Sequence, residues 1–147
     1  MAKRGISTTV TAVIVVAIVV IAAVALYFAT RPAPPTAPKV GLVLATGGLG
    51  DKSFNDISYA GVVKAKEELG IEFDYVEPTA IAEYEGFQRD FAKTGEYAII
   101  VCIGFDQADA LTKIAEEYPN QNFTIVDMVV DKPNVASLLF KANEGSF

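Results

Sequence analysis

The stretch that decides the fold is Val40-Gly41-Leu42-Val43-Leu44-Ala45-Thr46-Gly47-Gly48-Leu49-Gly50-Asp51-Lys52-Ser53-Phe54-Asn55-Asp56. An apolar run typical of a buried strand leads into a loop with three glycines, and a helix is predicted to begin near Phe54. Asp51 and Ser53 can each cap that helix. The end of the first strand of a parallel α/β sheet is where ligands usually bind. The loop is therefore a candidate ligand site, and a strand-to-helix turn with nothing bound is the alternative.

Alternating strand and helix patterns follow along the chain. Helices are predicted over residues 54–69, 81–93 and 108–118, and strands over 40–45, 71–76, 97–103, 123–126 and 135–140. Right-handed crossovers between such units build a doubly wound α/β fold with a mainly parallel sheet, in the order 2-1-3-4-5.

Apolar residues within these segments indicate which faces are buried. In the first predicted helix, the residues available to face a core are Ile57, Ala60, Gly61, Val63, Ala65 and Leu69. The second carries the aromatic stripe Tyr84, Phe87 and Phe91, and the third places Leu111, Ile114 and Ala115 inward. Cys102 lies inside an apolar strand and is expected to be a small buried side chain.

The N-terminal region has a different composition. Residues 12–29 carry no charged side chain, and 18 residues in a helix span roughly 27 Å, close to the thickness of a bilayer's hydrocarbon core. We expect a basic head over residues 1–9, a membrane anchor or signal helix over 10–30 and a proline-rich linker over 31–38. The head resembles an archaeal class III signal, cleaved after Gly5; a cleaved secretory signal and an uncleaved anchor are the alternatives. The flanking cations predict a body held at the cell membrane and facing outside.

The overall charge and the missing residue types exclude several functions. The nine basic and eighteen acidic residues after position 38 give that part a net charge of −9, so nucleic acid is not an expected partner. The sequence has no histidine and one cysteine. An internal disulfide, a histidine general base and a Cys/His zinc site are therefore excluded. We expect no cofactor and no metal site, and no enzymatic role, because no nucleophile–base pair is visible.

Three strand ends are predicted to meet at one edge of the sheet. The candidate ligand-binding residues there are Asp51, Phe54 and Asn55 from the first loop, Phe105 after the third strand and Asp127 after the fourth. Aromatic rings with carboxylate and amide groups suit a flat, uncharged molecule that bears hydroxyls. A phosphate site is not expected, because the loop lacks the GK[ST] motif and the G-x-G-x-x-G spacing. Helix capping is the alternative role for Asp51, and capping of the following turn is the alternative for Asp127.

These residues also carry a family resemblance. The sequence resembles the basic membrane protein family of ABC-transporter solute-binding proteins, of the purine-nucleoside receptor lipoprotein type. The motifs that carry the resemblance are Gly50-Asp51-Lys52-Ser53-Phe54-Asn55, Gly104-Phe105, Ala115 with Tyr118-Pro119, Phe123 to Asp127 and Glu144-Gly145-Ser146-Phe147. The resemblance covers residues 39–147. It implies a type I periplasmic-binding-protein-like first lobe, and an extracellular receptor whose two lobes close on a nucleoside, with a purine favoured. It also implies delivery to an ABC permease and its ATPase.

The chain is shorter than the members of that family. They run to roughly twice its length, so residues 39–147 are interpreted as an incomplete N-terminal lobe, and the chain as a truncated fragment. One lobe cannot bury most of a small ligand, so we expect weak binding by this chain alone. An anchored sensory or interaction domain that uses the same lobe without transport is the alternative function.

Overall fold

The computed structural model describes residues 18–22, 26–27, 37–141 and 144. The chain divides into two units, Met1–Thr36 and Ala37–Phe147. Residues 18–22 and 26–27 are helical. The predicted head lies outside the described residues, as does most of the predicted anchor and linker. Among the residues that are described, no helix is both long enough and apolar enough to cross a membrane.

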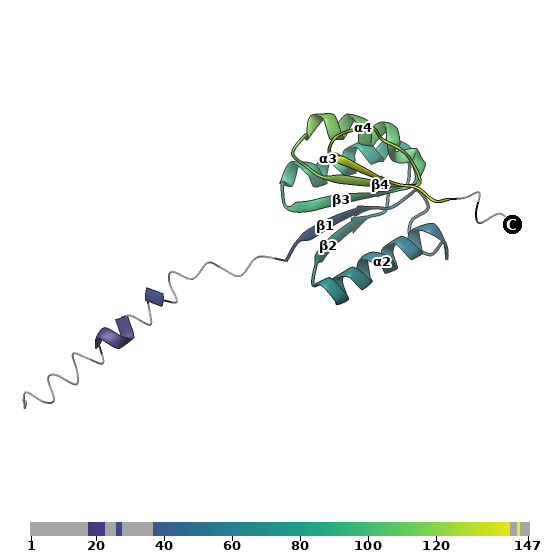
Figure 1. The fold of residues 1–147 in the computed structure, drawn as a ribbon. Coiled ribbons are helices and arrows are strands. Elements are labelled where there is room, and N and C mark those ends of the chain that lie inside the picture. Colours follow the sequence, from purple (N-terminus) through teal and green to yellow (C-terminus); the bar gives the residue numbers. More distant parts are fainter. Residues whose placement is uncertain (1–17, 23–25, 28–36, 142–143, 145–147) are drawn as a thin grey trace, which may run out of the picture. The chain divides into compact units, whose positions relative to one another are not determined.

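The second unit is built on a parallel sheet of five strands in the order β2-β1-β3-β4-β5 (Figure 1). The strands are β1 (Lys39–Val43), β2 (Glu72–Val76), β3 (Tyr97–Ile103), β4 (Phe123–Val126) and β5 (Val135–Leu138). The helices are α2 (Phe54–Leu69), α3 (Tyr84–Thr94) and α4 (Ala108–Glu117), with short 3-10 turns η1 (Ile81–Glu83) and η2 (Phe105–Gln107). The doubly wound α/β fold and the strand order predicted from the sequence are confirmed.

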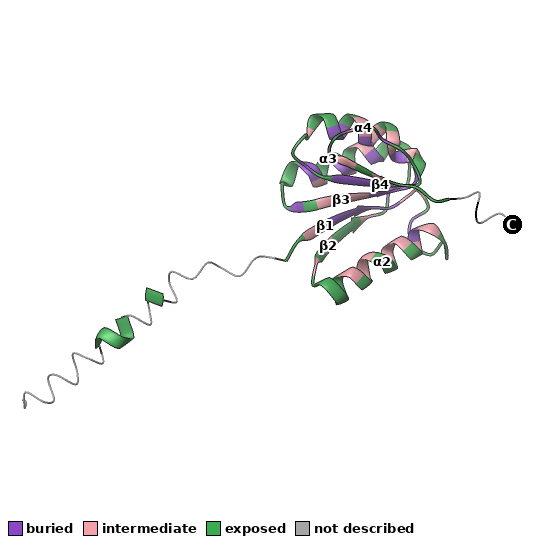
Figure 2. Cartoon of the chain, viewed as in Figure 1, coloured by how far each residue is buried: buried purple, intermediate pink, exposed green. Residues whose placement is uncertain are grey.

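Helices α3 and α4 pack on one face of the sheet and cover the larger core (Figures 1 and 2). This core joins the two helices to the central strands, and its fully enclosed side chains include Tyr84, Ile100, Leu111, Ile114 and Ile125. The aromatic stripe and the inward residues predicted for these helices are confirmed. Cys102 is buried in the same core, and burial raises the pKa of its thiol well above the usual range.

Helix α2 packs on the opposite face, through a different set of residues from the predicted one. Phe54, Tyr59 and Val62 contact the smaller core around Leu42 and Leu44. Tyr59 also meets the rings of two β2 aromatics edge-on, with centroids 5.7 Å from Phe73 and 4.9 Å from Tyr75. The prediction for this helix is wrong at four positions, because Ile57, Ala60, Gly61 and Leu69 are exposed. Packing of the tyrosine against β2 sets the rotation of the helix, and the apolar pattern alone does not contain that information.

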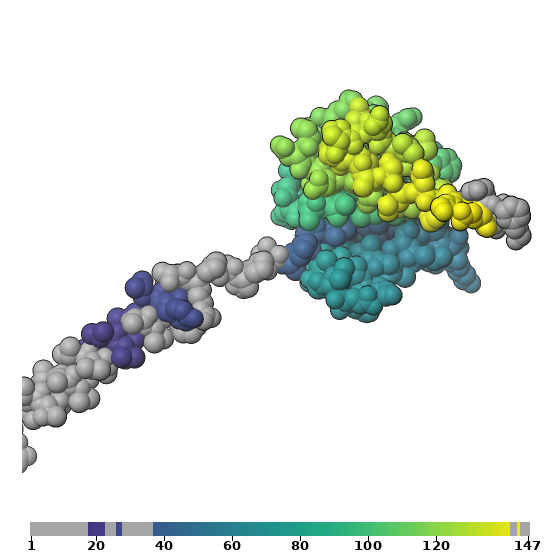
Figure 3. All heavy atoms as spheres, in the orientation of Figure 1, coloured from purple at the N-terminus to yellow at the C-terminus, as the bar shows by residue number. Residues whose placement is uncertain are grey.

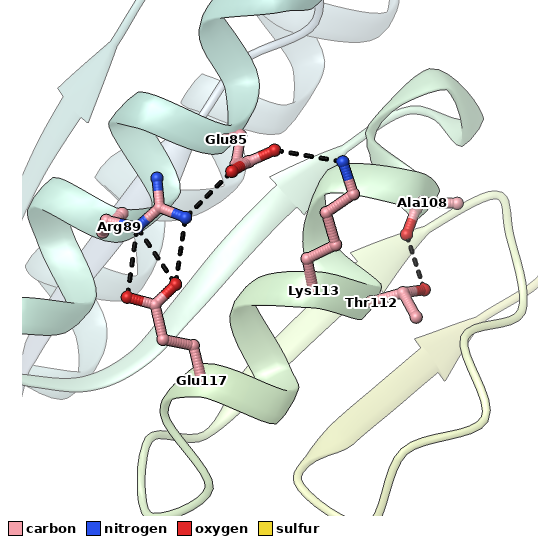
Figure 4. Close-up of polar contacts among 6 residues, drawn as sticks. All are labelled: Glu85, Arg89, Ala108, Thr112, Lys113 and Glu117. Atoms are coloured by element: carbon pink, nitrogen blue, oxygen red, sulfur yellow. Dashed lines mark hydrogen bonds and ion pairs between the residues drawn. The ribbon is translucent and has the colours of Figure 1, made fainter.

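An ion-pair network joins α3 to α4 at the surface (Figure 4). Arg89 binds Glu85 on its own helix and Glu117 on α4, each at 2.9 Å, and Lys113 of α4 reaches Glu85 at 3.2 Å. All four side chains remain more than one third exposed, so each pair stabilises the fold by about 1 kcal/mol at most. The apolar core, rather than this network, holds the helices in place.

The last strand ends earlier than predicted. β5 stops at Leu138, two residues before the predicted end at Phe140. Leu138, Leu139 and Phe140 are all more than half exposed. In Figure 3 the C-terminal part of the chain (yellow) forms a strip of surface between the layer of α3 and α4 and the layer of α2. The outer edge of the sheet beside β5 is therefore open to solvent in the described part of the chain.

The packing of the two faces can be tested with isoleucines of opposite exposure. Ile114→Ala should lower the free energy of unfolding by about 2 to 5 kcal/mol, because it opens a cavity in the enclosed core. Ile57→Ala should change it by less than about 0.5 kcal/mol, because that side chain is 72% exposed. Urea unfolding of the full chain, followed by circular dichroism, measures both. Equal losses at the two positions would contradict the assigned face of α2.

Candidate ligand-binding site

The carboxyl ends of the parallel strands meet at one edge of the sheet. The loop of residues 46–53 follows β1, Glu77 and Pro78 follow β2, residues 104–106 follow β3, and Asp127 follows β4. The strand order places β1 and β3 side by side, so their two loops are neighbours. This is the edge at which the sequence predicts a ligand.

A buried glutamine ties the ends of the two central strands together. Nε2 of Gln107 donates to the carbonyl oxygens of Val43 and Ile103, each at 2.9 Å, and of Leu44 at 3.3 Å. Its Oε1 accepts a hydrogen bond from Nε2 of Gln88 on α3 at 2.9 Å. Both glutamines are fully buried. The spacing between the loops after β1 and β3 is therefore fixed from inside the domain.

A buried tyrosine makes a second link between the same loops. The hydroxyl of Tyr84 accepts a hydrogen bond from the backbone N–H of Thr46 at 2.8 Å and donates to Oδ2 of Asp106 at 2.7 Å. Burial, together with the hydrogen bond to the Asp106 carboxylate, raises the pKa of Tyr84 above its ordinary value. The phenol therefore stays protonated at neutral pH and keeps donating to Asp106.

Backbone N–H groups of the glycine-rich loop donate hydrogen bonds to carboxylates of the same chain. The N–H of Leu49 donates to Glu77 at 2.7 Å, and the amides of Gly50 and Lys52 donate to Asp56 at 2.7 and 2.8 Å. Free loop amides of this kind are what a phosphate would bind. Because two carboxylates already hold them, the loop presents negative charge instead of donors. That this is not a phosphate site stays a prediction, and these hydrogen bonds agree with it.

Asp51 caps α2. Its two carboxylate oxygens accept hydrogen bonds from the backbone amides of Ser53, Asn55 and Asp56 at 2.9, 3.0 and 3.2 Å. The side chain of Ser53, the other predicted cap, makes no capping hydrogen bond. Hydrogen bonds from the backbone N–H groups of Asn55, first, and of Ser53 lower the pKa of the Asp51 carboxyl. A ligand contact by Asp51 stays a prediction, and such a contact would share oxygens that the helix already uses.

Asn55 faces inward. Its Oδ1 accepts from the backbone N–H of Ala45 at 2.8 Å, and its Nδ2 donates to the carbonyl of the same residue at 3.3 Å. The side chain is 3% exposed. The amide therefore joins the first turn of α2 to the end of β1, and its predicted role in ligand binding stays untested.

The other three predicted residues offer more accessible groups. Phe54 is half-buried and meets Phe140 edge-on, with ring centroids 6.2 Å apart. Phe105 is 67% exposed at the start of η2. Asp127 is exposed with a left-handed backbone (φ 70°), and its N–H donates to the carbonyl of Leu138 at 2.8 Å. Phe105 and Asp127 are thus the predicted residues best placed to touch a ligand.

The hollow beside the loop is small. It measures about 280 Å³ and is lined by Gly47, Gly48, Glu77, Pro78 and Thr79. A larger hollow of about 450 Å³ lies at the opposite edge, near Tyr97 and Tyr118. We assign the site to the carboxyl edge, because ligands of open α/β sheets bind there. Sequence reasoning missed Glu77 in this lining, although its position directly after β2 places it at the same edge.

Comparison with known proteins identifies the family. A family model described as "ABC transporter substrate-binding protein PnrA-like" matches residues 38–147. The chain belongs to this family. The resemblance seen in the sequence motifs is therefore confirmed.

The relatives are much longer than this chain. A protein named "Uncharacterized lipoprotein" from Pyrococcus horikoshii is 36% identical over 108 residues, which cover 72% of this chain and 27% of that protein. The "ABC transporter nucleoside-binding protein BmpA" of Lactococcus lactis is 30% identical over 114 residues, which cover 74% of this chain and 32% of the relative. The chain thus spans about a third or less of the curated relatives that it matches.

Solved structures show the same fold. A solute-binding protein of an ABC transporter system from Aeropyrum pernix superimposes with a TM-score of 0.67 at 36% identity, covering 71% of this chain and 29% of that one. A fragment of a lipoprotein from Peptoclostridium difficile gives a TM-score of 0.64 at 24% identity, and covers 73% of this chain and 88% of that one. The second likeness concerns the fold alone.

The inward role of Asn55 leads to a stability prediction. Asn55→Ala should lower the free energy of unfolding by about 1 to 3 kcal/mol, because both backbone groups of Ala45 lose a buried partner. Ser53→Ala is the matched control and should change it by less than about 0.5 kcal/mol, because the Ser53 side chain caps nothing. Urea unfolding at pH 7 tests the two variants. An unchanged free energy of unfolding in Asn55→Ala would show that the two hydrogen bonds between Asn55 and Ala45 do not stabilise the fold.

The cap made by Asp51 predicts a dependence on pH. The pKa of Asp51 is lower in the folded state than in the unfolded chain. Its stabilising contribution is therefore present above the unfolded pKa of about 4 and disappears as the pH falls through the folded pKa. Asp51→Asn should be less stable than the wild type at pH 7, and the gap should shrink at about pH 2. Unfolding curves at the two pH values test this, and a constant gap would contradict it.

Proposed function

We propose that this chain carries part of the first lobe of a substrate-binding protein that delivers a nucleoside, with a purine favoured, to an ABC importer. The ligand would lie at the carboxyl edge of the sheet, in a cleft between two lobes. The observation that carries the proposal is membership of the PnrA-like family. In addition, backbone N–H groups of the glycine-rich loop already donate hydrogen bonds to carboxylates of the chain.

The chemistry of the edge supports an uncharged ligand. Glu77, Asp51 and Asp56 surround the loop with negative charge, which disfavours a nucleotide phosphate. The exposed ring of Phe105 offers a stacking surface for a base. Within the described part of the chain, the Asp127 carboxylate has no hydrogen-bonding partner, so it can accept from a ribose hydroxyl or a ring N–H.

Names of the relatives support the ligand class and the location. The Lactococcus lactis relative is named a nucleoside-binding protein, and the Pyrococcus horikoshii relative a lipoprotein. By extension we propose that this chain acts outside the cell, held at the membrane by residues 10–30, and works with a permease and an ATPase. We propose a binding role and no enzymatic one.

A ligand screen on the full chain tests the proposal. Ligand-observed NMR should detect a purine nucleoside, with a dissociation constant weaker than micromolar because one lobe encloses only one side of the ligand. The matching 5′-monophosphate should bind more weakly still, because of the carboxylates around the loop. Ribose, a pyrimidine nucleoside and an amino acid complete the screen. Binding of free sugars in preference to nucleosides would contradict the assigned ligand class.

A substitution at Phe105 can test ligand binding without disturbing the fold. Phe105→Ala should weaken nucleoside binding by roughly 1 to 3 kcal/mol if the ring packs on the base. It should alter the free energy of unfolding by less than about 0.5 kcal/mol, because the side chain is 67% exposed. Leu69→Ala is the control: that residue is 74% exposed at the far end of α2, and its loss should leave binding unchanged. Unchanged affinity in Phe105→Ala would remove this residue from the proposed site.

A further inference from the structure

We propose that Asn122 is the acceptor of an N-linked glycan. The inference rests on the proposed function in one respect, because such a modification requires the domain to face outside. The sequence contains a single Asn-x-Ser/Thr triplet with a residue other than proline in the middle, Asn122-Phe123-Thr124. It lies at the start of β4, and the structure places its asparagine on the surface.

The remaining asparagines differ from Asn122 in exposure or in sequence. Asn55 is enclosed and bound to Ala45. Asn134 donates to three backbone carbonyls, those of Ala115, Tyr118 and Gln121, at 3.0 to 3.1 Å. Asn120 is exposed, but the residue two positions later is Asn122 itself. Among the asparagines that the structure describes, Asn122 alone combines an exposed side chain with a hydroxyl two positions later.

The backbone of the acceptor is held firmly while its side chain is free to carry a substituent. The carbonyl of Asn122 accepts from the N–H of Ile100 at 3.0 Å and from Nε2 of Gln121 at 2.9 Å. Its Nδ2 donates to the carbonyl of Ala98 over a long 3.4 Å. A glycosylated amide nitrogen keeps one N–H, so this weak bond can persist. The modification therefore costs the fold no buried hydrogen bond.

The position of Asn122 is compatible with ligand binding. It precedes β4, so it lies at the amino edge of the parallel sheet, opposite the loops of the candidate ligand site. A shallow hollow of about 350 Å³ beside it is lined by Ala98, Ile99, Pro133 and Asn134, among others. The first sugar has room there, and the glycan extends away from the carboxyl edge.

The position of the Thr124 hydroxyl indicates that the glycan is transferred to Asn122 before the domain folds. Thr124 is 7% exposed, and its Oγ1 donates to the carbonyl of Ala136 in β5 at 2.8 Å. A transferase cannot reach this hydroxyl once β4 has paired with β5. The sugar is therefore added while the chain is still extended during export, before the sheet closes.

The co-substrate is an oligosaccharide joined through phosphate to a membrane lipid. Nδ2 of Asn122 forms a bond to the anomeric carbon of the first sugar. The bond between that carbon and the phosphate oxygen breaks, and the lipid phosphate leaves with the electron pair. The proton lost from Nδ2 passes to the surrounding water, and nothing is oxidised or reduced.

Peptide mass spectrometry of the chain from the membranes of its own organism tests the proposal. Trypsin should yield a peptide of residues 114–141, because Pro133 protects the bond after Lys132. We expect this peptide to carry sugar residues, located at Asn122 by fragmentation that preserves the glycan. An unmodified peptide overturns the inference. Protease accessibility on intact cells then separates failure of the glycan proposal from failure of the proposed location. A domain that is cleaved from outside but unmodified contradicts only the glycan. A domain that is protected from the protease contradicts both the glycan and the location outside the cell.

Three variants in the same organism complete the test. Asn122→Gln and Thr124→Val should both abolish the modification, the second because it removes the hydroxyl while nearly keeping the shape. Thr124→Ser should retain it. Folded, unmodified chain should be a poor acceptor for the transferase compared with a short peptide of the same sequence. Modification that persists in Thr124→Val would contradict the triplet as its cause.

Discussion

The buried amide of Gln107 holds the centre of this domain together. Its side-chain nitrogen donates to the last carbonyl of β1, to the carbonyl of the next residue, Leu44, and to the last carbonyl of β3, and its side-chain oxygen accepts from Gln88. A buried amide that lost these partners would cost about 1 to 3 kcal/mol for each group left unpaired. Two adjacent strand ends are thus fixed to each other and to α3, and the loops that follow them inherit that spacing.

Most polar groups at the carboxyl edge are already hydrogen-bonded to the loops there, without a ligand. Asp51 binds amides at the start of α2, Asp56 and Glu77 bind amides of the glycine-rich loop, and Tyr84 joins Thr46 to Asp106. Such pre-positioning lowers the entropy that a ligand would lose in ordering the site. In the proposed site, it also leaves the exposed residues Phe105 and Asp127 to contact the ligand.

The sequence was sufficient to predict the fold, whereas the ligand-binding role of the predicted site residues stays a prediction. Apolar runs separated by helical patterns specify a parallel doubly wound sheet, because few other arrangements bury them. The rotation of α2 was mispredicted, since Tyr59 packs against β2 aromatics that lie 14 and 16 residues further along the chain. Likewise, nothing local indicates that the Tyr84 hydroxyl bridges Thr46 and Asp106, which are 38 and 22 residues away. An asparagine such as Asn55 looks the same in sequence whether it holds a ligand or a strand end.

The contact between Gly48 and Glu77 has a consequence for how this family member could change its ligand. A Cβ atom at position 48 would lie 2.5 Å from Oε2 of Glu77, the oxygen that holds the Leu49 amide. Any side chain there would displace the carboxylate and uncover a backbone donor in a glycine-rich turn. In the proposed site, discrimination against anions thus depends on Gly48. Under the proposed function, a substitution at this glycine is one way in which the lobe could come to accept phosphorylated solutes.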